Sequence, residues 1–215
     1  LVLEQVLEQP GKAHGGGNRC TGCGLSGVHK SGDRCATCRP DAPSSKRRLR
    51  EIRKKQWAVH DYLTDIGGLV IESEKRIDFC GQGMSHRSFA LVDMVVEQPT
   101  RRALLSIDEN QHRDESLGCE IARMTSVIQG IALSDNVRPL LWIRFNPDAY
   151  RVDGHLQRMP KKRRYEQLLQ LLRDVPDVTG VVYMYYDVDS NNDLMLLQEE
   201  GYSKHFHSQY VTRWP

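Results

Sequence analysis

The sequence predicts a three-layer α/β fold, in which helices flank a mixed central sheet, preceded by a small zinc-ribbon-like module. Segments of helical periodicity alternate with short apolar strand candidates, and two closely spaced cysteine pairs lie near the N-terminus. Alternating strands and amphipathic helices cover both faces of a sheet, which defines this class. We expect an N-terminal extension over 1–13, a zinc-binding module over 14–43 and the main domain over 44–215.

A long basic helix is the first element expected in the main domain. Apolar residues recur at helical spacing up to residue 66, where Gly67 and Gly68 end the pattern. Residues 46–55 hold seven cations against one acid: Lys46, Arg47, Arg48, Arg50, Arg53, Lys54 and Lys55. Their potential attracts a phosphate backbone, so DNA is the predicted partner. A solvated amphipathic face or a localisation signal remains an alternative. The basic turn 161–164 is a second candidate clamp on DNA.

Strands and helices alternate through the rest of the domain. In chain order we expect short strands at 69–72 and 76–79, a hairpin of strands 89–97 and 102–109, a helix after His112, a strand within 138–147, a helix opened by the basic turn 161–164, and a strand at 178–188. The run 138–147 is almost continuously apolar, as expected of a central strand covered on both faces.

The densest polar cluster, residues 106–112, lies where the second hairpin strand ends. A turn near 98–101 places Asp93, in the middle of the first strand, roughly opposite residues 106–108. A buried charge is costly unless it is paired or binds a cation, so Asp93 and Asp108 are predicted to hold Mg²⁺ or Mn²⁺. Such an ion can activate water in phosphodiester hydrolysis. We expect Glu109 and Gln111 to support the site, and His112 to position the water or contact the phosphate.

Each of these residues also has a simpler interpretation. Asp93 alone is equally compatible with a structural carboxylate paired with an arginine, and Asp108 or Glu109 with a cap on the following helix. A single histidine such as His112 is more often a surface or hydrogen-bonded structural residue. Their combination on adjacent strands is what favours a site.

Four runs carry a resemblance to a known family: LVDMVVE, LLSIDENQH, CEIARM and IRFNPDAY. Together they resemble the PD-(D/E)xK superfamily of restriction-endonuclease-like proteins. They are most similar to the zinc-ribbon-bearing type of large DNA viruses, algae and protists, distantly related to very-short-patch-repair and EDxHD homing endonucleases. The resemblance covers most of residues 14–188. It implies a metal-dependent DNA endonuclease, a hydrolase, built on a core of helix, three antiparallel strands, helix and strand.

The resemblance also implies residue roles. Asp93 matches the aspartate of the first motif and residues 108–112 match the second. Glu120 and Arg123 are expected to face back toward the site, and Arg144, Asn146 and Asp148 to lie at a strand end beside it. One position departs from the pattern: Ser106 stands where related sequences usually have a glutamate, and Asp108 stands where the motif lysine is expected.

This departure leaves the activity open. Either Asp108 and a nearby backbone carbonyl suffice to hold the metal, or the chain is a catalytically inactive DNA-binding module derived from such a nuclease. A zinc-stabilised protein-interaction domain with structural buried acids is a third interpretation, which the basic helix argues against.

The cysteine pattern predicts a structural zinc site. Cys20 and Cys23, then Cys35 and Cys38, recur within a repeat of His-x5-Cys-x2-Cys, and this spacing suits a closed site of four thiolates on Zn²⁺. Residues 11–43 are almost devoid of apolar side chains, so we expect this module to need the metal to fold. His14 and His29 recur at the repeat spacing and remain alternative ligands.

The composition argues against a membrane protein. No run approaches the roughly 18 to 20 apolar residues that a membrane helix needs, and no segment resembles a signal peptide. We therefore expect a soluble intracellular protein, in the nucleus or wherever its target DNA lies. The net charge is only +2, so a DNA-binding footprint must be local. The oligomeric state and the presence of further domains or chains stay open.

Overall fold

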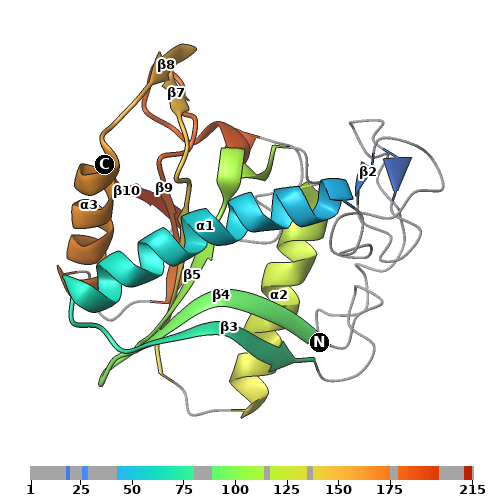
Figure 1. Ribbon diagram of the computed structural model, residues 1–215, viewed down its shortest axis with the longest axis vertical. Helices are drawn as coiled ribbons and strands as arrows, with labels where there is room; N and C mark the ends of the chain where they lie inside the picture. Colours follow the sequence, from blue (N-terminus) through green and yellow to red (C-terminus); the bar gives the residue numbers. More distant parts are fainter. Residues whose placement is uncertain are drawn as a thin grey trace, which may run out of the picture.

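A mixed sheet forms the centre of the molecule (Figure 1). The computed structural model describes the backbone of residues 18–19, 26–28, 43–79, 89–113, 117–134, 138–174, 179–198 and 211–214, and the side chains of 53–79, 89–113, 120–133, 138–174 and 179–198. Across these residues the strand order is β10-β9-β6-β5-β4-β3. The strands are β3 (Ile71–Asp78), β4 (Phe89–Glu97), β5 (Arg102–Ile107), β6 (Leu140–Phe145), β9 (Gly180–Met184) and β10 (Val211–Trp214).

The sheet combines an antiparallel and a parallel half. The strands β3, β4 and β5 form an antiparallel meander, whereas β5, β6, β9 and β10 run parallel to one another. Because parallel neighbours need a crossover, a helix separates β5 from β6 and another separates β6 from β9. The carboxyl ends of β5, β6 and β9 therefore meet at one edge of the sheet.

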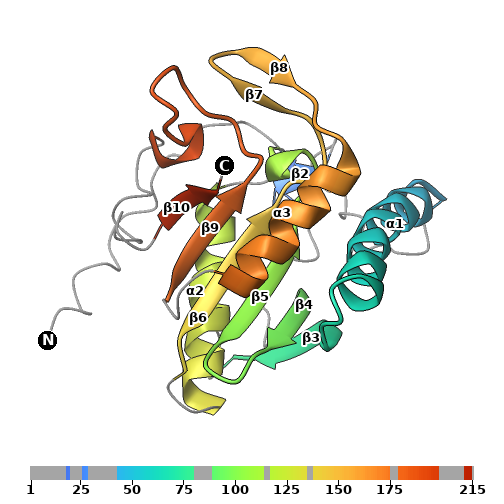
Figure 2. The same ribbon diagram turned by 90° about the vertical axis from the view of Figure 1, so that its left-hand side faces the viewer.

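Helices cover both faces (Figure 2). On one face lie α1 (Pro43–Asp65) and α3 (Lys161–Asp174), which bury Leu63 and Leu168 against the sheet. On the other face lies α2 (Leu117–Ser134), which buries Met124 and Val127. Every residue of β6 is buried, as a strand with both faces covered requires. The predicted α/β class, a mixed sheet between helices, is confirmed.

Several element boundaries differ from the sequence prediction. The two short strands expected at 69–72 and 76–79 are one strand, β3, interrupted by Glu74 in a left-handed conformation with φ 51°. The second hairpin strand ends at Ile107, so Asp108 and Glu109 leave the sheet. The hairpin of β7 (Tyr150–Val152) and β8 (His155–Gln157) was not predicted, because two strands of three residues are too short for a periodicity to show.

The zinc-module prediction lies almost entirely outside the described residues. Within that module the structure describes one antiparallel pair, β1 (Asn18–Arg19) and β2 (Ser26–Val28). All four cysteines of the predicted site, Cys20, Cys23, Cys35 and Cys38, fall outside the described part, as do His14 and His29. The zinc site therefore stays a prediction. Among the described helices, none is long and apolar enough to cross a membrane.

Candidate active site

Strands β4 and β5 part at Asp93. Their regular pairing ends with Met94 opposite Leu105, and the next contact is a hydrogen bond from the Ile107 backbone N–H to Asp93 Oδ2, at 2.7 Å. The Asp93 carboxylate thus accepts the hydrogen bond that a backbone carbonyl would accept in a regular antiparallel pair of strands. On the other side, Gln56 of α1 donates to the Asp93 carbonyl oxygen at 3.2 Å. Asp93 therefore lies where the two strands diverge, facing the end of β5.

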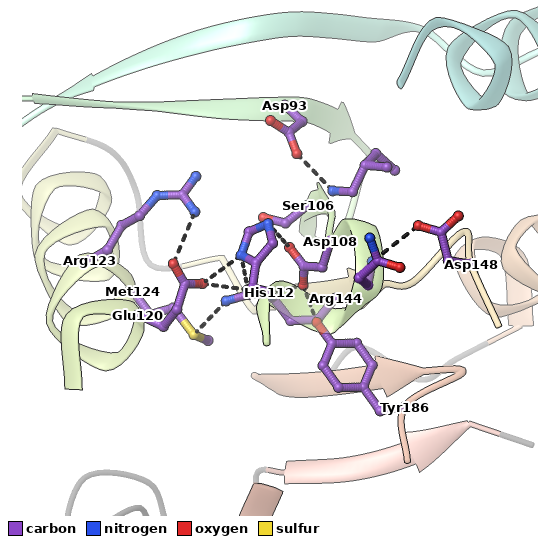
Figure 3. Close-up of polar contacts among 12 residues, drawn as sticks. Asp93, Ser106, Asp108, His112, Glu120, Arg123, Met124, Arg144, Asp148 and Tyr186 are labelled. Atoms are coloured by element: carbon purple, nitrogen blue, oxygen red, sulfur yellow. Dashed lines mark hydrogen bonds and ion pairs between the residues drawn. The ribbon is translucent and has the colours of Figure 1, made fainter. Parts of the chain in front are cut away.

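Asp108 is the first residue after β5 and is completely buried. Its Oδ2 accepts hydrogen bonds from Arg144 Nε and from the Tyr186 hydroxyl (Figure 3). Its Oδ1 is also buried but makes no hydrogen bond, and lies 3.5 Å from His112 Nε2. One oxygen of this carboxylate is therefore saturated, and the other still has the capacity to accept a proton donor or a cation.

Arg144 joins Asp108 to Glu120. Its guanidinium, 2% exposed as a residue, donates to both carboxylates, and its Nη1 lies 3.3 Å from the sulfur of Met124. Burial alone lowers the pKa of Arg144, but the charges of Asp108 and Glu120 outweigh it and raise that pKa well above its usual value. Arg144 is thus a permanent cation that fixes two acids beneath the candidate site.

His112 sits over this cluster in a strained turn. Asn110, Gln111 and His112 have φ values of 51°, 60° and 51°, so three consecutive residues with side chains adopt the left-handed region. That conformation costs about 1–2 kcal/mol for each such residue. It places His112 Nδ1 at 3.4 Å from both Glu120 Oε2 and Arg144 Nη2. Strain of this kind persists where surrounding contacts enforce it, and it is common at functional sites.

Three hydrogen bonds to residues distant in the sequence hold this turn in place. The Gln111 side-chain amide donates to Asp187 Oδ1 at 2.9 Å, and the Asp187 backbone N–H donates to Gln111 Oε1 at 2.7 Å. The Asn110 backbone N–H donates to Asp148 Oδ2 at 3.1 Å. Gln111, predicted as a supporting site residue, is therefore an anchor of the turn.

Glu109 faces the site from the same turn. Its Oε1 is buried without a hydrogen-bond partner. The pKa of Glu109 is raised to about 7, chiefly by burial and also by the nearby charge of Asp93, against the lowering effects of a backbone hydrogen bond, His112 and Lys55. Burial also raises the pKa of Asp93, against the lowering effect of Arg123. The two acids lie close enough to sense each other's charge.

Lys55 brings the basic helix into contact with the site. Its Nζ lies 2.8 Å from both carboxylate oxygens of Asp148, the residue that also holds the Asn110 backbone. Of the other predicted DNA-binding cations, Arg53 and Lys54 are exposed. The side chains of Lys46, Arg47, Arg48 and Arg50 lie outside the described part. Asn146, which the resemblance places at a strand end beside the site, makes a structural contact: its buried side-chain amide donates to the Tyr185 carbonyl at 2.7 Å.

Ser106 fills a structural position. It is 1% exposed, and its Oγ accepts a hydrogen bond from the indole nitrogen of Trp142 at 3.0 Å. A glutamate here would add a longer, charged side chain beside the Asp108–Arg144 pair. The sequence departure at Ser106 therefore coincides with a tightly packed site in which the hydroxyl is fully used.

Two simpler interpretations are now decided. Asp108 and Glu109 do not cap the following helix, because α2 begins only at Leu117. The buried arginine partner belongs to Asp108 rather than to Asp93. Arg123, one turn along α2 from Glu120, donates instead to the Leu91 carbonyl at 3.0 Å, which explains its electrostatic effect on Asp93.

Tyr186 was not predicted as a site residue, because a tyrosine inside an apolar run resembles any other strand residue in the sequence.

An open cleft of about 450 Å³ borders the cluster. His112, Arg113, Tyr186 and Asp187 line it, together with Met195. Arg113 and Asp187 form an ion pair of 2.7 Å at its wall. The cleft leaves His112 accessible from outside, with 20% of its side chain exposed.

The carboxylates of the site are ligands of the type that a hard divalent cation binds. Carboxylate oxygens are what Mg²⁺ prefers, and Asp108 Oδ1 and Glu109 Oε1 are buried acceptors without a partner. Within the described side chains, no three His, Cys, Asp or Glu residues already converge as a complete metal site.

Comparison with known protein families, curated proteins and solved structures finds no match to the chain. The function is therefore inferred from these residues.

The raised pKa of Glu109 predicts a pH-dependent stability. In the folded state Glu109 keeps its proton up to about pH 7, whereas in the unfolded chain it loses that proton near the ordinary glutamate pKa of 4.5. The folded state then binds more protons between these values, so its stability falls as the pH rises. In buffer without divalent cations, Glu109→Gln should be more stable than the parent by about 2 kcal/mol at about pH 8, and nearly equal to it at about pH 4.5.

Urea unfolding at both pH values measures this difference, and Glu166→Gln, on the exposed face of α3, serves as the control. Equal stability of Glu109→Gln and the parent at the higher pH would show that the Glu109 carboxyl is not held in an unfavourable environment.

Proposed function

We propose that this protein is a metal-dependent endonuclease that hydrolyses DNA phosphodiester bonds with Mg²⁺ or Mn²⁺. One observation carries the proposal: two buried carboxylate oxygens, Asp108 Oδ1 and Glu109 Oε1, have no hydrogen-bond partner. Both residues come directly after β5, the strand that diverges from β4 at Asp93. Such acceptors are costly to bury unfilled, and a cation with its waters satisfies them.

The element order adds support. The sequence of α1, then β3, β4 and β5, then α2 and β6 is a helix, three antiparallel strands, a helix and a strand. This is the core that the resemblance to the PD-(D/E)xK superfamily implies, with Asp93 on the second strand and Asp108 at the end of the third. The restriction-endonuclease-like assignment of the fold is part of the proposal.

Each residue has a role that follows from its contacts. Asp93 and Asp108 would hold the divalent ion, which would neutralise charge on the phosphate and acidify a water. Glu109, with a pKa of about 7, is the general base, which accepts a proton from the attacking water at Oε1. His112 lies at the mouth of the cleft and contacts the phosphate. Arg144 is a positioning residue, since it fixes Asp108 and Glu120.

DNA is held by positive charge on α1. The exposed Arg53 and Lys54 lie on the same helix as Lys55, whose amine reaches the Asp148 carboxylate at the site. Contacts between such cations and phosphates supply affinity without base specificity. The proposal includes one structural Zn²⁺ on Cys20, Cys23, Cys35 and Cys38, which would organise the N-terminal module.

A second candidate is an inactive DNA-binding module descended from such a nuclease. Ser106 favours it, because the hydroxyl is committed to Trp142 where related sequences carry an acid. The saturation of Asp108 Oδ2 by Arg144 and Tyr186 also favours it. The two candidates agree on DNA binding and differ in cleavage.

Plasmid cleavage distinguishes them. Supercoiled plasmid is incubated with Mg²⁺ or Mn²⁺ and with the parent chain, Ser106→Glu or the smaller Ser106→Asp. We expect the parent to nick or linearise the plasmid in a metal-dependent way. Cleavage only by the acidic variants would establish the inactive module instead. No cleavage by any of the three, on plasmids of several different sequences, would contradict the nuclease proposal.

A further inference from the structure

A β-ribbon projects from the sheet edge that carries the candidate site. Strands β7 and β8 pair antiparallel and extend beyond the central sheet in both views (Figures 1 and 2). Asp153 and Gly154 join them, with φ values of 49° and 75°. Two consecutive left-handed residues make the tight turn that matches the twist of a two-stranded ribbon. The sequence Asp-Gly therefore builds a well-defined ribbon tip.

The base of the ribbon is fixed while its outer strand is exposed. Tyr150 is buried against Tyr185, with ring centroids 5.7 Å apart. The Arg151 backbone N–H donates to Asp187 Oδ1 at 2.7 Å, and Val152 bridges to Val188. By contrast, every residue of β8 is exposed, including Leu156 at 55%. An anchored base under a fully exposed strand suits contact with a partner rather than with the protein's own core.

Positive charge gathers on this ribbon and on the helix that follows it. Residues 150–166 contain six cations and two acids, a local net charge of +4 against +2 for the whole chain. Five of the cations are exposed: Arg151, Arg158, Lys161, Lys162 and Arg163. The sixth, Arg164, is buried and donates to the backbone carbonyls of Asn146 and Asp148. Among the ion pairs of the described side chains, the one that involves these cations is Lys162 with Glu166, at 4.0 Å. The charge of the five exposed cations is therefore largely uncompensated within the described part of the protein.

The start of α3 opposes the ordinary preference of a helix. Its first turn holds four cations and no acid. The N-terminus of a helix carries a partial positive charge, which favours acids there and disfavours cations. An arrangement that is unfavourable in the free protein becomes favourable next to a polyanion. The charge pattern thus agrees with the exposed ribbon in indicating an anionic partner.

The ribbon also lies in the right place for a substrate of the candidate site. It begins two residues after Asp148, which binds both Lys55 of α1 and the backbone of the site turn. The ribbon and the N-terminal half of α1 flank this turn on opposite sides (Figure 1). A duplex lying across the turn would meet positive charge on both sides.

We propose that the β7–β8 ribbon enters the major groove of DNA beside the cleaved bond. The exposed cations Arg151, Arg158, Lys161, Lys162 and Arg163 then bind the flanking phosphates. The major groove, about 12 Å wide, admits a two-stranded ribbon. His155 and Gln157 lie two residues apart on β8, both exposed, and offer donors and acceptors to base edges. The identity of the partner rests on the proposed function.

Duplex binding without divalent cations tests the phosphate contacts. Fluorescence anisotropy of a labelled duplex of about 30 bp compares the parent with a triple variant, Arg151→Gln, Arg158→Gln and Lys161→Gln. We expect binding at least roughly tenfold weaker at about 0.1 M salt, and a salt dependence reduced by about 2 to 3 in slope. The control variant removes three cations from the opposite end of the sheet: Arg102→Gln, Arg138→Gln and Arg173→Gln. Equal loss in the two variants would overturn the proposal.

A modified duplex tests the groove. Replacing purines by 7-deazapurines removes the N7 acceptors of the major groove and keeps the backbone charge. We expect the parent to bind this duplex about threefold or more weakly, and the double variant His155→Ala, Gln157→Ala to bind both duplexes alike. Equal binding of both duplexes by the parent would overturn the insertion into the groove. Because neither experiment involves cleavage, a protein that binds through the ribbon but never cuts would contradict the nuclease proposal alone.

Discussion

Asp93→Asn is expected to reduce metal-dependent DNA cleavage by about 10³-fold or more, because loss of the ligand removes several kcal/mol of transition-state stabilisation. The substitution keeps an oxygen that can accept the Ile107 N–H, so the divergence of β4 and β5 stays intact. Burial raises the pKa of Asp93, so a neutral amide there should not destabilise the metal-free protein. Single-turnover cleavage and thermal unfolding, measured on the same preparations, separate these two effects.

Asp78→Asn is the matched control for Asp93→Asn. Asp78 lies at the end of β3, where it pairs with Arg76 at 2.8 Å on the surface. Its replacement removes the same charge and should leave cleavage within about twofold of the parent, since exposed ion pairs contribute little. Unchanged cleavage by Asp93→Asn would remove Asp93 from the site and with it the central assignment of the proposed function.

Arg144→Met is expected to lower the free energy of unfolding by about 3–5 kcal/mol. Methionine has a similar volume, so the loss comes from electrostatics rather than from a cavity. Without the guanidinium, the buried acids Asp108 and Glu120 lose the buried cation that they share. Because protonation relieves that repulsion, the loss should shrink at acidic pH. Urea denaturation at about pH 7 and pH 4.5 measures both effects.

Arg123→Met tests whether the effect belongs to the buried pair. Arg123 also approaches Glu120, at 3.9 Å, but 28% of its side chain is exposed. We expect its loss to cost less than about 1 kcal/mol, as for a partly solvated pair. Adding Asp108→Asn to Arg144→Met should recover part of the stability. An equal cost for Arg123→Met and Arg144→Met would contradict the idea that Arg144 neutralises the acids under the site.

The elements that were predicted well are those whose periodicity is long and regular. The α1 and α2 helices and strand β4 show their pattern over nine or more residues, and each was expected near its observed bounds. Short elements gave no such signal, so the β7–β8 ribbon escaped prediction. The left-handed conformation of Glu74 was not predicted either, because the neighbouring strand of the sheet imposes such a conformation.

The candidate site divides in the same way. Residue type and spacing were enough to single out Asp93 and the block 106–112, because buried acids next to a polar strand end are unusual in any sequence. Their partners could not be read from the chain. The contacts of Asp108 with Arg144 and Tyr186 span 36 and 78 residues, and Lys55 reaches Asp148 across 93. Contacts at such separations depend on how the layers pack.

By itself the sequence determined the class of the fold, the hairpin with Asp93, the basic helix and the acids from which a catalytic site is proposed. These are local properties, fixed by the periodicity of apolar residues and by the cost of burying charge. Only the tertiary structure decided which acids are neutralised and which keep an oxygen free. It turned Gln111 into an anchor and gave Glu109 a pKa of about 7. The reason is that burial and charge neighbours, which set the chemistry of a carboxylate, arise only when distant segments meet.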